Sequence, residues 1–140
     1  MKKDWSPYLL SVLRIIVAFL FFQHGAAKWF AFPAAVFPDN GVAAVGSMPW
    51  FAAVIETIGG ALMLVGLFTR QVAFILAGEM AFAYFLGHAS KNFLWPTLNG
   101  GEPAVFYCFT FLYFSAAGPG PWSLDALIAS RRRMSTVPVS

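Results

Sequence analysis

Three ionisable side chains, Arg14, His24 and Lys28, lie within one strongly apolar segment near the start of the chain. Two carboxylates, Glu56 and Glu79, lie in later apolar segments. An ionisable group at membrane depth costs about 2.5 to 3.5 kcal/mol on insertion scales, so each of these groups needs a partner. An imidazole, an ammonium group and a carboxylate that meet in one place can bind a polar ligand and exchange a proton with it.

The composition is that of a membrane protein. Of the 140 residues, 59% are hydrophobic and only 11% are charged, whereas soluble domains have about 25% charged residues. The basic residues form no stripe with interleaved aromatic side chains, so nucleic-acid binding has no support. The single cysteine, Cys108, excludes an internal disulfide and a dithiol relay within one chain.

Four apolar segments predict an all-α fold, a single integral membrane four-helix bundle over residues 1–140. The predicted spans are residues 8–30, 49–68, 71–87 and 103–117. The first is long enough for the ~20 residues that a spanning helix needs. A short interfacial helix is expected at about 124–130. A cleaved signal peptide is the alternative for the first segment, but Arg14 interrupts the uncharged centre that such a peptide has, and three more spans follow.

Basic residues and tryptophans predict the orientation. The basic residues gather on one side of the predicted bundle, at Lys2, Lys3, Arg70 and Arg131–Arg133. The positive-inside rule therefore puts both termini in the cytoplasm of a multi-pass protein in a bacterial inner membrane. Tryptophans fall at both predicted interfaces, Trp5 and Trp122 at the inner one and Trp29, Trp50 and Trp95 at the outer one.

Helical geometry places the basic groups of the first span on one face. At about 100° per residue, Lys28 falls about 40° and His24 about 80° from Arg14. Comparison of depths predicts two pairs. Lys28 and His24 would meet Glu56 in the outer half, and Arg14 would meet Glu79 in the inner half. Two interpretations stay open: the pairs only fix helix register, or the outer cluster is a ligand site.

The fourth span is rich in aromatic residues, and Tyr107 is its candidate for the ligand site. Its simpler interpretation is packing, and the sharper one is stacking on a flat ligand such as a quinone ring. Further polar candidates are His88, Asn99 and Glu102. No metal site is expected, because a Glu-x-x-His pair and a haem attachment motif are both absent. Haem held by His24 and His88 is disfavoured, since nothing supplies the wider pocket.

Several short motifs in a fixed order give the chain a resemblance to a known family. They are Leu13-Arg14, His24-Gly25-x-x-Lys28, Glu56-x-x-Gly59-Gly60, Gly66-Leu67-x-Thr69-Arg70, Glu79-Met80 and Asn99-Gly100-Gly101-Glu102. With these motifs the chain resembles the DoxX family of small bacterial four-span membrane proteins over residues 9–127. The resemblance implies a four-helix membrane bundle and an association with redox processes, because the family's name comes from thiosulfate–quinone oxidoreduction systems. It implies no settled reaction.

Two main hypotheses follow. In the first, the chain is an inner-membrane protein that binds a quinone-like molecule near His24, Lys28 and Glu56. Whether it is an enzyme stays open, since it has no self-contained redox centre and would need a redox partner protein to do more than bind. In the second, it is a structural module that assembles or stabilises a partner protein in the bilayer. Transport has less support, because alternating access usually rests on more helices and a visible repeat, although a homo-oligomer could supply both.

Overall fold

The computed structural model describes residues 4–38 and 41–135, and over these residues every regular element is helical. The elements are α1 (Ser6–Phe30), α2 (Met48–Val65), α3 (Thr69–Ala83), the π-helical turn η1 (Tyr84–His88), α4 (Pro96–Asn99), α5 (Glu102–Ala117) and α6 (Leu124–Ser135). The predicted all-α class is therefore confirmed. The expected basic residues Lys2 and Lys3 lie outside the described residues.

The helices follow the predicted spans closely. Helices α1 and α2 are long and apolar enough to cross a membrane. Helix α3 continues into η1, so together they cover the third predicted span, and α5 covers the fourth. The count of four spans and the interfacial placement of α6 stay predictions. Helix α6 is longer than predicted, because it continues through the arginine cluster to Ser135.

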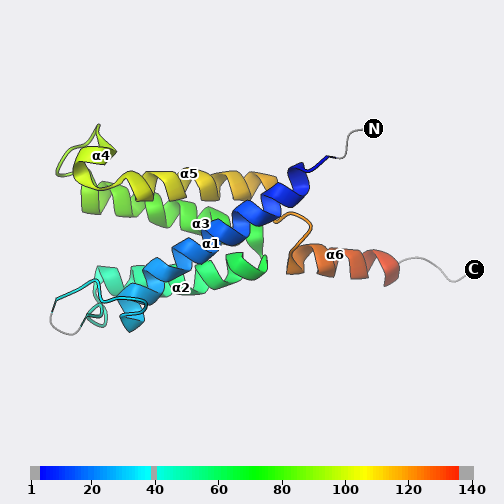
Figure 1. The fold of residues 1–140 in the computed structure, drawn as a ribbon, viewed down its shortest axis with the longest axis horizontal. Coiled ribbons are helices and arrows are strands. Elements are labelled where there is room, and N and C mark those ends of the chain that lie inside the picture. The colour runs from blue at the N-terminus through cyan, green and yellow to red at the C-terminus, as the bar shows by residue number, and fades with distance from the viewer. Residues whose placement is uncertain (1–3, 39–40, 136–140) are drawn as a thin grey trace, which may run out of the picture.

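The helices pack in two pairs. Helix α1 packs mainly against α2, α3 packs mainly against α5, and contacts between α2 and α3 join the pairs. Figure 1 shows the end of α1, the start of α2 and the loop 89–101 at one end of the molecule, and the start of α1 and the turns that precede α3 and α6 at the other. Phe21 of α1 and Phe111 of α5, both fully buried, meet edge to face with ring centroids 4.7 Å apart. This aromatic contact closes the core between the pairs.

Arg14 holds the end of the molecule that carries the termini. Its guanidinium is fully buried. Nη1 donates to the carbonyls of Met63 and Leu64, the latter at 2.8 Å. Nε donates to the carbonyl of Pro119 at 2.9 Å, and Nη2 donates to that of Trp122 at 2.5 Å. The last carbonyls of a helix have no intrahelical partner and carry the negative end of its dipole, so a buried cation is stable at the end of α2.

The predicted pair between Arg14 and Glu79 is therefore wrong. Arg14 is satisfied by backbone carbonyls, and neither carboxylate oxygen of Glu79 has a hydrogen-bond partner in the described part of the chain. The depth comparison considered only side chains as counterions and left out the carbonyls of a helix end. In addition, α3 begins at Thr69, so Glu79 lies about 15 Å along it, well away from the end that Arg14 holds.

Two more charged side chains satisfy helix ends nearby. The carboxylate of Asp125, in the first turn of α6, accepts from the backbone N–H groups of Phe68 and Thr69, both at 2.9 Å. Arg70 donates to the carbonyl of Ser115 at 3.0 Å, in the last turn of α5. An anion thus lies at the start of α3 and a cation at the end of α5, the sense that the helix dipole favours.

We expect Arg14→Met to lower the free energy of unfolding by at least ~3 kcal/mol, because each buried carbonyl left without a donor costs about 1–3 kcal/mol. Arg14→Lys should recover only part of the loss, since one ammonium group cannot donate in all the directions that the planar guanidinium does. Reversible unfolding in mixed detergent micelles measures both variants. Arg131→Met, at an exposed position, is the control. Equal stability of Arg14→Met and the control would contradict the role assigned to Arg14.

Candidate functional site

The predicted pair between Lys28 and Glu56 is present at the end of the molecule opposite Arg14. Lys28 Nζ lies 2.5 Å from Glu56 Oε1. Glu56 is 2% exposed, whereas the Lys28 side chain is 26% exposed, so the ammonium faces both the carboxylate and the open space outside it. His24, the third predicted member, does not pair with Glu56. Its ring instead meets the ring of Tyr107 edge to face, with centroids 5.8 Å apart.

A close crossing of α1 and α2 brings Lys28 to Glu56. A Cβ atom on Gly25 would lie 2.5 Å from Thr57 Oγ1 and 2.6 Å from the Thr57 backbone nitrogen. A Cβ atom on Gly60 would lie 3.0 Å from the backbone of Phe22. Small residues at such positions let two helix backbones approach closely in a membrane protein. The glycine of the His24-Gly25-x-x-Lys28 motif is therefore explained by the contact that positions its lysine.

Glu79 of α3 lines a separate pocket between α2 and α3, together with Ala52 and Phe82. Glu56 Oε2 and both carboxylate oxygens of Glu79 are buried and have no hydrogen-bond partner among the described residues. Lys28 therefore pairs with only one of the two buried carboxylates, that of Glu56. The position of Glu79 was not predicted, because the comparison of depths had assigned it to Arg14.

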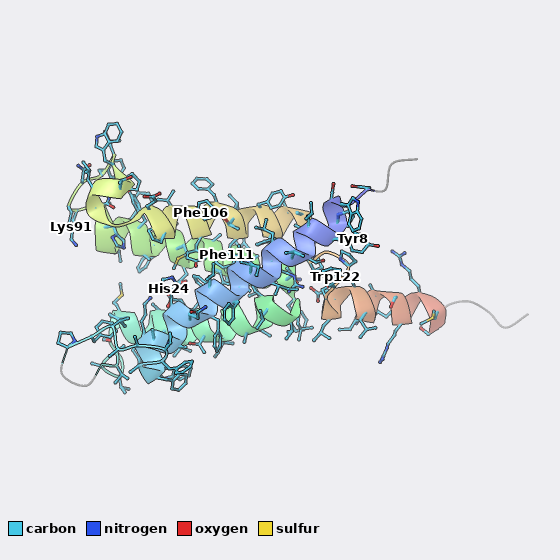
Figure 2. The ribbon with its side chains drawn as sticks, viewed as in Figure 1. Tyr8, His24, Lys91, Phe106, Phe111 and Trp122 are labelled. Carbon is cyan, nitrogen blue, oxygen red and sulfur yellow. The ribbon has the colours of Figure 1, made fainter. Side chains whose placement is uncertain are left out.

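A pocket opens beside the Lys28–Glu56 pair. His24, Lys28 and Tyr107 line it, together with Leu20 and Gln23 of α1, and residues 33–37 of the following loop close one side. Its volume is about 440 Å³, within the range of about 300 to 1,000 Å³ of small-molecule sites. Figure 2 marks His24 on α1 among the side chains of this region. Glu56 pairs with Lys28 from the α2 side, so it acts on the pocket through the ammonium.

The other polar candidates do not belong to this pocket. The Asn99 side chain donates to the Tyr84 hydroxyl at 3.3 Å and accepts from the Gly101 backbone N–H at 2.7 Å. The backbone carbonyl of Asn99 lies 3.1 Å from His88 Nδ1. These contacts fasten the loop between η1 and α5, a role that the sequence did not reveal. Glu102 lies at the start of α5 and lines a different groove, which Leu13 of α1 also lines.

The part of the chain that the structure describes contains no cluster of side chains suited to bind a metal ion. A search of those residues finds no group of three or more His, Cys, Asp or Glu side chains that could hold an ion. The side chains that line the pocket offer hydrogen bonding by an imidazole, an ammonium and a phenol. The carboxylate of Glu56 can exchange a proton with the ammonium that it contacts.

Comparison with known proteins gives the family. Residues 9–89 match the DoxX family profile. The chain belongs to the DoxX family. A protein of Haemophilus influenzae, named only as an uncharacterized protein, is 48% identical to this DoxX family member over 126 residues, which are 88% of this chain and 92% of that protein. An uncharacterized membrane protein of Mycobacterium tuberculosis is 26% identical over 139 residues, 90% of this chain and 85% of that protein. No solved structure matches the chain.

We expect Lys28→Met to lower the free energy of unfolding by about 3–5 kcal/mol, because it leaves the Glu56 carboxylate buried and unpaired. The double variant Lys28→Met/Glu56→Met should regain most of that loss, because it removes both charges. A double-mutant cycle compares the unfolding free energies of the wild-type protein, Lys28→Met, Glu56→Met and the double variant. Lys91→Met, at an exposed loop position, is the control. Strictly additive losses would mean that the two charges are not coupled.

Proposed function

We propose that this DoxX family member is an inner-membrane protein associated with redox processes and binds a quinone-like molecule in the pocket beside Lys28 and Glu56. One observation carries the proposal: an imidazole, an ammonium and a phenol from two helices line one pocket of suitable volume, and a buried carboxylate touches the ammonium. The two carbonyl oxygens of a quinone need hydrogen-bond donors, and its ring needs an aromatic wall. The pocket offers both.

Each side chain has a role that follows from its position. His24 and Lys28 donate hydrogen bonds to carbonyl oxygens of the ring. Tyr107, which packs against Phe21 and Phe111, presents an aromatic surface fixed by its neighbours. Glu56 takes or gives a proton through its contact with the ammonium. Electrons would come from, or go to, a redox partner protein.

We also propose that the four longer helical segments, α1, α2, α3 with η1, and α5, span the bilayer with both termini in the cytoplasm. The ends of these segments alternate between two sides (Figure 1), and Arg70 and the Arg131–Arg133 cluster lie on the side of the termini. Such an excess of basic residues is typical of the cytoplasmic side.

A labelling experiment tests this orientation. In a Cys108→Ser background, a membrane-impermeant maleimide should label Thr97→Cys on intact cells, because Thr97 lies in the loop assigned to the outer side. Ser130→Cys, in α6, should be labelled only after the cells are permeabilised. Both positions are exposed, so each serves as the reactivity control of the other. The reverse pattern would overturn the orientation.

Menadione, a quinone without a tail, tests the binding site. Titration of the purified protein in nanodiscs should quench tryptophan fluorescence saturably, and His24→Ala should weaken the apparent affinity about tenfold, the equivalent of ~1.4 kcal/mol for one lost hydrogen bond. His88→Ala, outside the pocket, is the matched control. Quenching that does not saturate, or that His24→Ala leaves unchanged, argues against the site. A folded protein that co-purifies with a partner and binds no quinone would support the structural-module hypothesis instead.

A further inference from the structure

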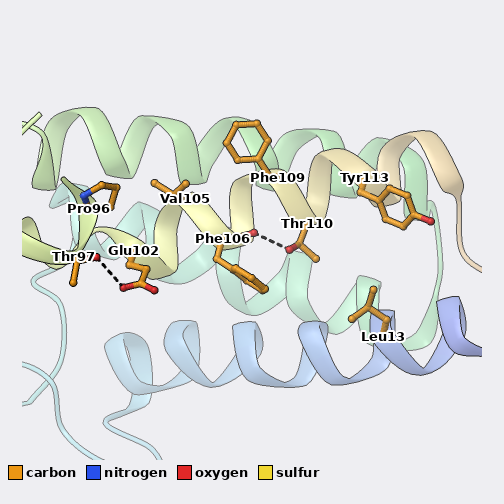
Figure 3. A pocket seen from close by; sticks show the side chains of 9 residues that line it. All are labelled: Leu13, Pro96, Thr97, Glu102, Val105, Phe106, Phe109, Thr110 and Tyr113. Atoms are coloured by element: carbon orange, nitrogen blue, oxygen red, sulfur yellow. Dashed lines mark hydrogen bonds between the residues drawn. The ribbon is translucent and has the colours of Figure 1, made fainter. Parts of the chain in front are cut away.

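A lateral groove lies between α1 and α5, next to the His24 pocket. Helix α1 packs on α2 and α5 packs on α3, so α1 and α5 touch each other over only a short stretch. The groove is lined mainly by Leu13 of α1 and by Val105, Phe106, Phe109, Thr110 and Tyr113 of α5. Figure 3 shows these side chains along the two helices, with Phe106 directed into the space between them. The groove has a volume of about 540 Å³.

The wall of the groove is apolar along most of its length. Phe106 is 69% exposed and Tyr113 is 56% exposed, so large aromatic surfaces face the open side. The hydroxyl of Thr110 donates to the carbonyl of Phe106 at 2.7 Å and is therefore satisfied within the helix. The polar lining is concentrated at one end, where Thr97 and Glu102 lie (Figure 3). The groove thus suits a long apolar chain.

Groove and pocket share their two helices. Leu13 lines the groove and Leu20 lines the pocket, and seven residues of helix place them on one face of α1 about 10 Å apart. On α5, Phe106 lines the groove and the next residue, Tyr107, lines the pocket. From Leu13 to His24 the helix extends about 16 Å. A molecule that occupies both the groove and the pocket would therefore have its polar part near His24 and an apolar chain along α1.

We propose that the groove receives the isoprenoid tail of a membrane-resident quinone whose ring occupies the His24 pocket. This inference rests on the proposed function and specifies its substrate class: a long-tailed quinone that enters sideways from the bilayer, and not a soluble one. Charge favours this occupant over a phospholipid, because the Lys28 ammonium is already paired with Glu56 and offers little net charge to an anionic headgroup. A quinone headgroup is neutral and needs only hydrogen bonds.

The test compares two ligands with the same ring. Binding of menadione and of a menaquinone with a four-unit isoprenoid tail is measured by tryptophan quenching in phosphatidylcholine nanodiscs. Thr110→Trp fills the groove, and Thr110 itself does not line the pocket. We expect Thr110→Trp to weaken binding of the tailed quinone about fivefold or more while menadione binding stays unchanged. Thr110→Val, which keeps the shape of threonine, should leave both affinities unchanged.

The outcomes separate this inference from the proposed function. If the wild-type protein does not bind menadione saturably, the proposed function is wrong. If the wild-type protein binds menadione, but Thr110→Trp binds the tailed quinone as tightly as the wild-type protein does, only the groove assignment is overturned. If Thr110→Trp does not fold, Leu13→Trp blocks the groove from the α1 side and takes its place. Native mass spectra show whether a phosphatidylcholine molecule stays bound. If the wild-type protein retains this lipid, the blocked variant loses it, and both bind the quinones with equal affinity, the groove belongs to lipid and the inference is overturned.

Discussion

One buried guanidinium determines how the helices of this protein meet. Arg14 of α1 donates to carbonyls at the end of α2 and in the connection between α5 and α6. A charge at this depth is tolerable only because several acceptors surround it, and the planar fork of arginine can reach carbonyls in different directions at once. Close packing adds to the constraint, since a Cβ atom on Gly66 would lie 3.0 Å from the Arg14 Cζ atom. The position of α1 relative to α2 and to the connection between α5 and α6 therefore follows from this residue.

The buried charged groups toward the two ends of the molecule differ in how completely they are satisfied. At the Arg14 end, Asp125 and Arg70 cap helix termini and Ser11 accepts the Trp122 N–H at 3.2 Å. Toward the other end, Glu56 Oε2 and both carboxylate oxygens of Glu79 are buried and have no hydrogen bond in the described residues. Unsatisfied buried polar groups are costly, so they persist where something other than stability requires them. This contrast supports our proposal that the ligand binds at the His24 end, while the contacts of Arg14 join the helices at the opposite end.

Much of this arrangement could be predicted from the sequence, and the parts that could not share a physical reason. Apolar runs and turn residues predicted the helices, and the helical phase of Lys28 with the depth of Glu56 predicted their ion pair. His24 was predicted to join that pair but meets Tyr107 instead. The partners of Arg14 were missed because they are backbone carbonyls, which every residue has and which become available only where a helix ends. Glu79 was consequently assigned to a partner that it does not meet. The loop-fastening role of Asn99 was missed because its partners depend on the conformation of the loop.

The open side of the bundle also follows from residue size. Glycines at positions 25 and 60 draw α1 against α2, because a side chain at either position would collide with the facing helix. The α5 face opposite carries Phe106, Phe109 and Tyr113, which are too large for an equally close approach and stay exposed. A helix drawn closely to one neighbour leaves a gap at the other, and in a bilayer that gap is filled by apolar chains at little cost, because lipid tails are as apolar as the side chains they replace. Access from the membrane is thus a consequence of the same glycine contacts that bring Lys28 to Glu56.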